Sequence, residues 1–469
     1  MNQFTYNLIH DKFIIRKMII LNILDNGRKF VASNYLAEQL GCTVRTISTD
    51  ISQLKEELPQ NWEIHGLTNK GYILIKPLTN SLSTLVDSYL SSSTICKIML
   101  KIFKNEFYTM EKWSQLLYIN KSTLLNNLKE YNNILDNNKL SWNFRELQLT
   151  GDELNIRYYY CVFFYFIHKY KDRQILPDEL GKRIKLLLNK SNFSIDFEVL
   201  SCIIYVSIHR WLNKYTYEKV FYNAFQFNNS HMNFFNKLIE IIEDYYKIKI
   251  SQIECDALKL FLFFEMQNKS DHGMLYLKYL YELDKELYYS YLELIDIFKS
   301  RMSIGKKEEL CMRLIPYFFK ANFYNQYNLA INYVLEPLDM YKSVLLKGYN
   351  QNYNLVSRWN KKFNNTRFNS DEIKFISTYI TIILNSYIKK KVLLLYRGTD
   401  AAKEVIYSKL KKCLGEYVSI HSESRNNAKF DFIITNFQQE NTNSITFFIS
   451  DSLCDNTIKI IKENILDIK

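Results

Sequence analysis

The sequence predicts a mainly helical, multidomain protein. Apolar residues recur at helical spacing through most of its 469 residues, and only five prolines and 11 glycines interrupt them. Strand-like alternation is confined to short segments near residues 62–76 and 144–149 and to the last ~80 residues. Because 47% of the residues are hydrophobic, the chain can bury several cores, and its length suggests about three to five domains.

A helix-turn-helix with a β-hairpin wing is predicted between Ser33 and Pro77, above a helix over Phe13–Leu24. We expect Ser33 to cap the first helix of the motif, Gly41 to end it and Thr43 to cap the second. The residues expected to face the core are Leu36, Ala37, Leu40, Val44, Ile47, Ile51 and Leu54. The wing is expected from Trp62–His65 and Tyr72–Lys76, joined by Asn69, Lys70 and Gly71.

The outward face of the second helix carries hydrogen-bonding side chains that suit base edges and phosphates. We therefore predict that this module binds double-stranded DNA. The candidate contact residues are Thr43, Arg45, Thr46, Ser48, Thr49 and Ser52 on the helix and Lys70 on the wing.

A second helix-turn-helix is predicted over residues 111–131. Ser122 is expected to cap its second helix, after a turn at Asn120 or Lys121. The residues expected to face inward are Trp113, Leu116, Leu117, Leu124, Leu125 and Leu128. Phosphate contacts, and some base contacts, are predicted from Asn120, Lys121, Ser122 and Thr123.

The middle of the chain is predicted to be helical. A strand over Phe144–Leu149 leads into a helix whose first turn holds Asp152 and Glu153, which we interpret as capping residues rather than a catalytic pair. The helices expected after it fit two bundles of about 100 residues each, with a break near Ser300–Lys306. They span 155–170, 178–189, 196–214, 231–247, 251–268, 272–300, 305–320, 325–347, 351–363 and 370–390.

The C-terminal segment changes to an α/β pattern. A buried strand over Val392–Tyr396 is followed by a helix over Ala401–Cys413, and a last helix spans Thr457–Ile465. Further strands are expected at Tyr417–His421, Phe430–Thr435 and Ile445–Ser450. This alternation predicts a small parallel sheet with helices on its faces.

Charge and composition restrict the function. The formal net charge of +12 suits a nucleic-acid partner, yet residues 1–77 carry nine Lys and Arg against seven Asp and Glu, and residues 301–400 carry sixteen against seven. The eight cysteines form no CxxC pair or zinc-spaced cluster, and no glycine-rich phosphate loop is present, so we expect no catalytic residues, no metal and no cofactor. Without a signal peptide or a membrane-length apolar run, the expected location is the cytoplasm.

This order of parts resembles the Mga/AtxA-type virulence regulators of low-GC Gram-positive bacteria. The local markers are the winged motif, the second reader EKWSQLLYINKSTLLNNLKEYNNIL and the segment LQLTGDELNIRYYYCVFFYF, which matches an L-x-G-x-E-x-x-I-R pattern. The resemblance implies a winged helix-turn-helix over 1–78, a second, Mga-type one over 79–157, PTS-regulation domains over 158–298 and 299–390, and an enzyme-IIB-like domain over 391–469.

The resemblance also implies a homodimeric transcription activator, which pairs through its regulatory and C-terminal domains. The sugar phosphotransferase system would tune it through a phosphocarrier and one histidine in each regulatory domain. This sequence departs from that pattern. Glu198 falls near the first expected histidine, His209 is the only histidine in that helix, and residues 291–390 contain none, with Tyr379 near the second expected position. His209 is therefore the candidate phosphorylation site, and the alternative is a structural histidine beside Arg210.

Two other functions stay open. PTS-regulation domains also occur in RNA-binding antiterminators, although these begin with a small β-rich module and this chain begins with helices. A phosphotransferase-system component built on the C-terminal sheet is the other alternative. The cysteine that such domains often carry after the first strand is replaced here by Tyr396-Arg397-Gly398, which disfavours phosphotransfer.

Overall fold

The computed structural model describes residues 3–467 apart from 28, 78–79, 170–173, 192, 194, 218–226, 267–270, 303, 330–347, 363–366, 386–389, 415–417, 422–429, 438–444 and 450–454. Two compact units are formed. The first contains Met1–Glu293, Cys311–Lys342 and Phe368–Phe375, and the second contains Leu294–Leu310, Ser343–Arg367 and Ile376–Lys469.

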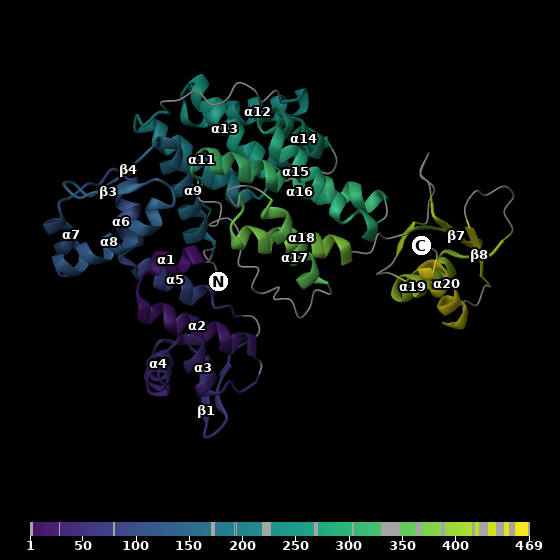
Figure 1. Ribbon diagram of the computed structural model, residues 1–469, viewed down its shortest axis with the longest axis horizontal. Helices are drawn as coiled ribbons and strands as arrows, with labels where there is room; N and C mark the ends of the chain where they lie inside the picture. The colour runs from purple at the N-terminus through teal and green to yellow at the C-terminus, as the bar shows by residue number, and fades with distance from the viewer. Residues whose placement is uncertain are drawn as a thin grey trace. The chain divides into compact units, whose positions relative to one another are not determined.

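The chain begins with a winged helix, coloured purple in Figure 1. Its elements are α1 (Gln3–Ile9), α2 (Lys12–Gly27), α3 (Ser33–Leu40), α4 (Val44–Glu57), β1 (Glu63–Leu67) and β2 (Gly71–Ile75). β1 and β2 pair antiparallel, as the predicted wing requires, and Val31 bridges to Tyr72 beside them. Gly71 has φ of 95°, and a Cβ there would lie 2.0 Å from the carbonyl oxygen of Val31, so this position needs glycine.

Local predictions for this module are mostly correct. Gly41 ends α3 in the left-handed conformation, and Thr43 caps α4. Two details are wrong: Ala32 rather than Ser33 occupies the cap of α3, and Val44 is 42% exposed because it begins α4 on the solvent side. The core between α2, α3, α4 and the wing contains Leu21, Leu24, Leu36, Ile47, Ile51, Leu54, Trp62 and Ile64.

A second winged helix follows with the same order of elements, coloured blue in Figure 1. They are α5 (Ser83–Ser92), α6 (Thr94–Phe103), α7 (Met110–Leu117), α8 (Lys121–Asp136), β3 (Ser141–Asn143) and β4 (Gln148–Thr150). The same sequence offset separates Gly41 from Tyr118 and Thr43 from Asn120, which end α7 and cap α8. The N-terminal third of the chain is therefore a structural repeat.

The second module corrects several predictions. The strand expected over Phe144–Leu149 is wrong, because residues 144–147 form the turn of the β3–β4 hairpin and make a second wing. Asn120 rather than Ser122 caps α8, and its side chain accepts a hydrogen bond from the Ser122 backbone. Leu116 is exposed and Leu117 half-buried, because the buried face of α7 is formed by Met110 and Trp113.

Helices occupy most of the chain between the second wing and residue 385. They are α9 (Glu153–His168), α10 (Asp178–Lys190), α11 (Phe197–Leu212), α12 (Asn229–Tyr246), α13 (Gln252–Glu265), α14 (Asp271–Leu283), α15 (Lys285–Ile297), α16 (Ile304–Gln326), α17 (Tyr349–Asn360) and α18 (Ser370–Asn385), with the 3-10 helix η1 (Lys299–Arg301) before α16. The single helix expected over 272–300 is wrong, because Asp284 separates α14 from α15. Residues 330–347 of the helix expected over 325–347 lie outside the described residues.

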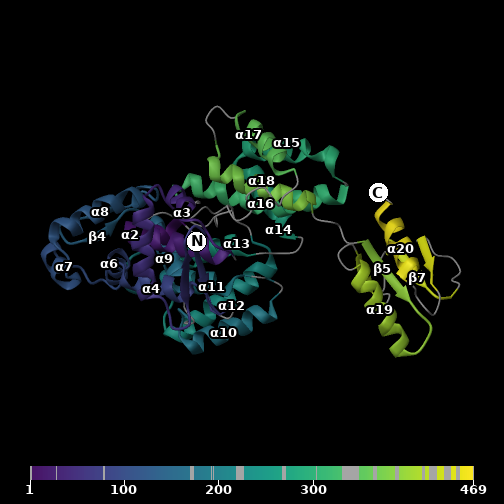
Figure 2. The ribbon, with the colours of Figure 1, turned by 90° about the horizontal axis from the view of Figure 1, so that it is seen from below.

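The C-terminal segment forms the predicted parallel sheet. Its strands are β5 (Lys390–Leu395), β6 (Val418–His421), β7 (Phe432–Thr435) and β8 (Ile445–Phe448), in the order β6-β5-β7-β8. Figure 2 shows helices α19 (Asp400–Leu414) and α20 (Asp455–Asp467) beside this sheet. Val392 and Leu394 of the central strand β5 share one apolar core with residues of both helices, so these two helices cover the same face.

Candidate nucleic-acid interface

Partly buried ion pairs hold the first reader helix, α4, against the helix beneath it. The guanidinium of Arg16 on α2 donates to both carboxylate oxygens of the buried Asp50 on α4. Next to it, Nζ of Lys17 donates to the Glu57 carboxylate at 2.5 Å. Since these contacts use the inner side of α4, its opposite face is left to solvent.

The predicted contact residues of α4 lie at its N-terminal end and along that outer face. Thr43 caps the helix by accepting a hydrogen bond from the Thr46 amide at 3.2 Å, and the two hydroxyl oxygens are 2.9 Å apart. The Thr49 hydroxyl donates to the Arg45 carbonyl at 3.1 Å. The exposed members of the set are Thr43, Arg45, Ser48, Thr49 and Ser52, whereas Thr46 is half-buried. Lys70 is exposed in the turn of the wing.

The second reader helix, α8, presents its predicted residues in the same way. Asn120, Lys121, Ser122 and Thr123 are all exposed at its N-terminal end. The Asn120 side-chain oxygen accepts bonds from both the amide and the hydroxyl of Ser122, each at 3.0 Å. Lys121 is paired with Glu111 of α7, an exposed contact that nucleic-acid phosphate can displace at small cost.

Two exposed residues of the second module were not singled out by sequence reasoning. Tyr118, in the turn between α7 and α8, is 97% exposed and has φ of 54°. Arg145 is exposed in the turn of the second wing, where its backbone amide donates to the Asn143 side chain at 3.1 Å. The sequence signal for Tyr118 is its alignment with Gly41, the residue that ends the corresponding helix of the first module.

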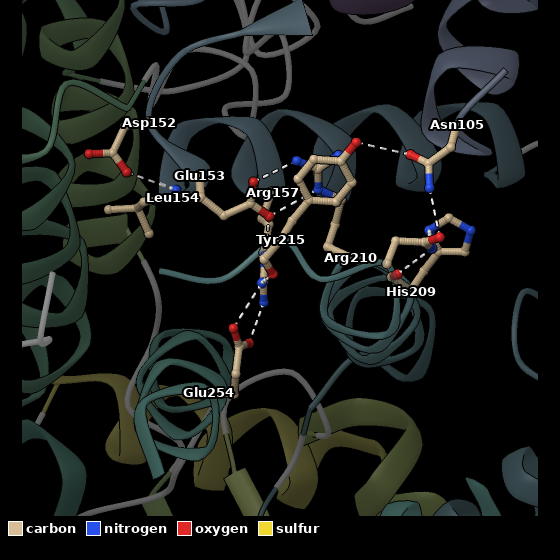
Figure 3. Close-up of polar contacts among 10 residues, drawn as sticks. Asn105, Asp152, Glu153, Leu154, Arg157, His209, Arg210, Tyr215 and Glu254 are labelled. Atoms are coloured by element: carbon tan, nitrogen blue, oxygen red, sulfur yellow. Dashed lines mark hydrogen bonds and ion pairs between the residues drawn. The ribbon is translucent and has the colours of Figure 1, made fainter. Parts of the chain in front are cut away.

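A buried charge network joins α9, α11 and α13, three of the helices after the second module (Figure 3). Arg157 on α9 donates to both carboxylate oxygens of Glu254 on α13, at 2.5 and 2.9 Å, and to Glu153 at 2.8 Å. Glu153 also accepts two bonds from Arg210 on α11, at 2.9 and 2.5 Å. Asp152 caps α9, as predicted, but Glu153 belongs to this network as well as to the first helical turn.

Burial shapes the electrostatics of this network. Arg157 is 1% exposed and Glu254 3% exposed. Burial raises the pKa of Glu254, and the hydrogen bonds from Arg157 oppose that shift. The Arg157 guanidinium also lies 4.1 Å from the ring centre of Tyr217, and that of Arg210 lies 3.6 Å from the ring centre of Tyr215. Four charges from three helices are therefore paired within one largely dry cluster.

His209 lies at the edge of this cluster, against the second module. Its ring stacks on Phe103 of α6 with centroids 4.2 Å apart, and its Nδ1 is 3.4 Å from the Asn213 side-chain nitrogen. Tyr215 donates to Asn105 (Figure 3), and Asn105 donates to the Asn213 side chain at 2.6 Å. Burial, followed by the charges of Arg210 and Lys104, lowers the pKa of His209.

The other two positions expected to bear on regulation, Glu198 and Tyr379, are not members of this cluster. Glu198 is exposed in the first turn of α11, and Tyr379 is half-buried on α18. Among the residues that the structure describes, no group of three His, Cys, Asp or Glu side chains is arranged to hold a metal ion. Within the same part of the chain, no helix is long and apolar enough to cross a bilayer.

Comparison with known proteins points in the same direction as this geometry. A helix-turn-helix (HTH) domain model matches residues 16–73, and the Mga helix-turn-helix domain model matches residues 78–164. The chain is 22% identical over 456 residues to the capsule synthesis positive regulator AcpB of Bacillus anthracis, covering 91% of this chain and 92% of that protein. It is 22% identical over 462 residues to AcpA, the capsule synthesis positive regulator of the same species, covering 91% and 93%.

A shorter match is 24% identical over 219 residues to the anthrax toxin expression trans-acting positive regulator of Bacillus anthracis, covering 45% of each chain. Two consecutive winged helices, both matched by helix-turn-helix models, define a transcription regulator with DNA-binding domains rather than an enzyme. These matches support the Mga/AtxA-type regulator family for this chain.

Proposed function

We propose that this chain is a homodimeric transcription activator that binds double-stranded DNA through both winged helices. The observation that carries the proposal is the repeated module, which presents the polar N-terminal ends of α4 and α8 to solvent. The activator role is supported by AcpB and AcpA, which are named positive regulators and match more than nine-tenths of this chain.

In the proposed complex each reader helix enters a major groove by its N-terminal end, as recognition helices do in this class of domain. On α4, Arg45, Ser48 and Thr49 face base edges or phosphates, and Lys70 holds the backbone from the wing. The remaining proposed contacts are Thr43, Thr46 and Ser52 in the first module and Asn120, Lys121, Ser122 and Thr123 in the second. Phosphate contacts supply affinity, and base contacts supply sequence preference.

The direct test is the affinity of the full chain for operator DNA at fixed salt. Arg45→Ala should weaken binding by about 1–3 kcal/mol. Lys55→Ala is the matched control, because Lys55 is an exposed cation in the last turn of the same helix, away from the end that enters the groove. Equal affinities for the wild type and Arg45→Ala would remove Arg45 from the proposed interface.

A competition between duplex DNA and hairpin RNA tests the choice of nucleic acid. The proposal expects the duplex to displace the hairpin, because the reader helices fit the wide major groove of B-form DNA and not the narrow one of an RNA helix. Preference for the hairpin would instead favour the antiterminator function. A reporter gene beside a bound operator would separate activation from repression.

The proposal assigns the helices from α9 to α18 to two PTS-regulation domains and the C-terminal sheet to an enzyme-IIB-like domain, and it attributes dimerisation to both. Light scattering of the full chain tests the dimer. The proposed location is the cytoplasm, where a phosphocarrier can reach the regulator. His209 is the proposed phosphoacceptor, and intact-mass measurement after incubation with phosphocarrier and phosphoenolpyruvate tests it, with His209→Ala as the control.

A further inference from the structure

The structural repeat identifies a residue of the second module, Tyr118, whose backbone ends α7 in a conformation that is costly for its side chain, while that side chain is almost wholly exposed. Tyr118 occupies the turn position that Gly41 occupies in the first module. Both are left-handed, with φ of 54° and 59°, a conformation that glycine adopts freely and that a residue with a Cβ adopts at a cost. With 97% of its surface exposed, the Tyr118 ring buries almost nothing in return.

Such a residue is more readily explained by a partner than by stability, because strain that persists without a folding benefit marks functional positions. Tyr118 stands two residues before Asn120, the cap of the reader helix. In helix-turn-helix complexes the first helix crosses the DNA backbone and the second enters the groove, so the turn between them lies beside phosphates and sugars. A tyrosine hydroxyl is a donor commonly used there.

The second wing carries a matching cation. Arg145 is exposed in the turn between β3 and β4, where Lys70 lies in the wing of the first module. Its backbone is held by the Asn143 side chain, while no acidic side chain in the described part of the protein forms an ion pair with its guanidinium. The backbone at Leu147, on the far side of this turn, donates to the Tyr108 carbonyl at 3.1 Å, which ties the wing to the segment before α7.

We propose that Tyr118, in the turn between α7 and α8, and Arg145, in the second wing, contact the sugar-phosphate backbone of duplex DNA. Tyr118 contributes an uncharged hydrogen bond from its hydroxyl, and Arg145 neutralises one phosphate. This inference rests on the proposed function, because it needs α8 to be a DNA reader. In this inference, Tyr118 and Arg145 position α8 on the duplex.

The two contacts differ in their response to salt, which makes them separable. Binding of the full chain to operator duplex is measured over a series of salt concentrations. Arg145→Gln should weaken binding and reduce the slope of log K against log salt by about 0.9, the value for one released phosphate contact. Tyr118→Phe should weaken binding by about tenfold and leave the slope unchanged, because no charge is lost.

Two further variants address folding. Tyr118→Gly should raise the melting temperature, because glycine relieves the left-handed turn, and should still weaken binding. Tyr289→Phe, at a tyrosine of α15 that is 60% exposed, should change neither property. A stabilised Tyr118→Gly that binds like the wild type would overturn the inference, as would wild-type affinity in both Tyr118→Phe and Arg145→Gln.

The binding of the wild type and of Arg45→Ala distinguishes a failure of this inference from a failure of the proposed function. If Arg45→Ala weakens binding while Tyr118→Phe and Arg145→Gln do not, only the backbone contacts of the second module are wrong. If the wild-type chain binds no duplex, the proposed function and this inference both fail.

Discussion

At the scale of single residues, His209 makes the stability of the regulator depend on pH. Burial lowers its pKa below the ordinary value of 6.5, and the charges of Arg210 and Lys104 act in the same direction. The unfolded chain therefore binds this proton more readily than the folded chain does. The stabilisation is present above the unfolded pKa and is lost as the pH falls from there towards the folded pKa.

The prediction is a fall in the free energy of unfolding of the first unit between about pH 7.5 and pH 5.5, and a smaller fall in His209→Phe. Phenylalanine keeps an aromatic ring against Phe103 but cannot be protonated. Urea unfolding followed by hydrogen exchange at α6 and α11 measures the difference. An identical pH dependence in the variant would show that His209 does not contribute, leaving His10, whose pKa burial also lowers, as the histidine to test.

At the scale of elements, the pairing of α9 with α13 depends on one buried carboxylate. Glu254→Ala would leave the Arg157 guanidinium with Glu153 as its remaining carboxylate partner, already shared with Arg210. Removing one member of a buried pair costs about 3–5 kcal/mol, because the other charge stays out of water. Asp244→Ala is the control, since the Asp244 pairs with Arg183 and Lys247 are exposed and such pairs contribute less than about 1 kcal/mol.

Chemical denaturation of both variants, with hydrogen exchange at α9 and α13, measures these effects. If Glu254→Ala lowered the free energy of unfolding by as little as Asp244→Ala, the charges of Arg157 and Glu254 would be in contact with water. Because α9 follows the second wing directly, the same variant should also loosen the second module.

Some elements carry a local sequence signal that predicts them, and others do not. The first module was predictable, because Gly41, Thr43 and the Asn69-Lys70-Gly71 turn each carry a local signal. The second wing was not, because its strands have three residues each and its turn contains no glycine. The break at Asp284 was hidden because apolar periodicity continues across it.

Some residues of the candidate site could likewise be predicted from the sequence, and others could not. The exposed polar residues at the start of α4 follow from helical periodicity alone. The Arg157–Glu254 pair does not, because its members are 97 positions apart in the chain and only the packed helices bring them together. The left-handed Tyr118 was hidden for a different reason, since tyrosine itself carries no signal for that conformation and only its alignment with Gly41 across the repeat indicates it.

At the scale of the whole molecule, net charge and DNA affinity should be only weakly related. Residues 1–77 carry nine Lys and Arg against seven Asp and Glu, and residues 78–154 carry eight against eight. Almost all of the net charge of +12 therefore comes from residues 155–469. The exposed cations at the N-terminal ends of the two reader helices and in the turns of the two wings are Arg45, Lys70, Lys121 and Arg145. If these four meet phosphates, the slope of log K against log salt should be about −3.6 per protomer.

The measurement combines a salt titration of duplex binding with light scattering, which gives the number of protomers per complex. Arg145→Gln should make the slope shallower, and Lys361→Gln, at an exposed cation in the basic segment 301–400, should leave it unchanged. A slope twice as steep per protomer, reduced by Lys361→Gln, would instead mean that the basic segment binds the duplex directly. In that case the winged helices would supply only part of the interface, and the charge excess would be a DNA-binding feature rather than solvated surface.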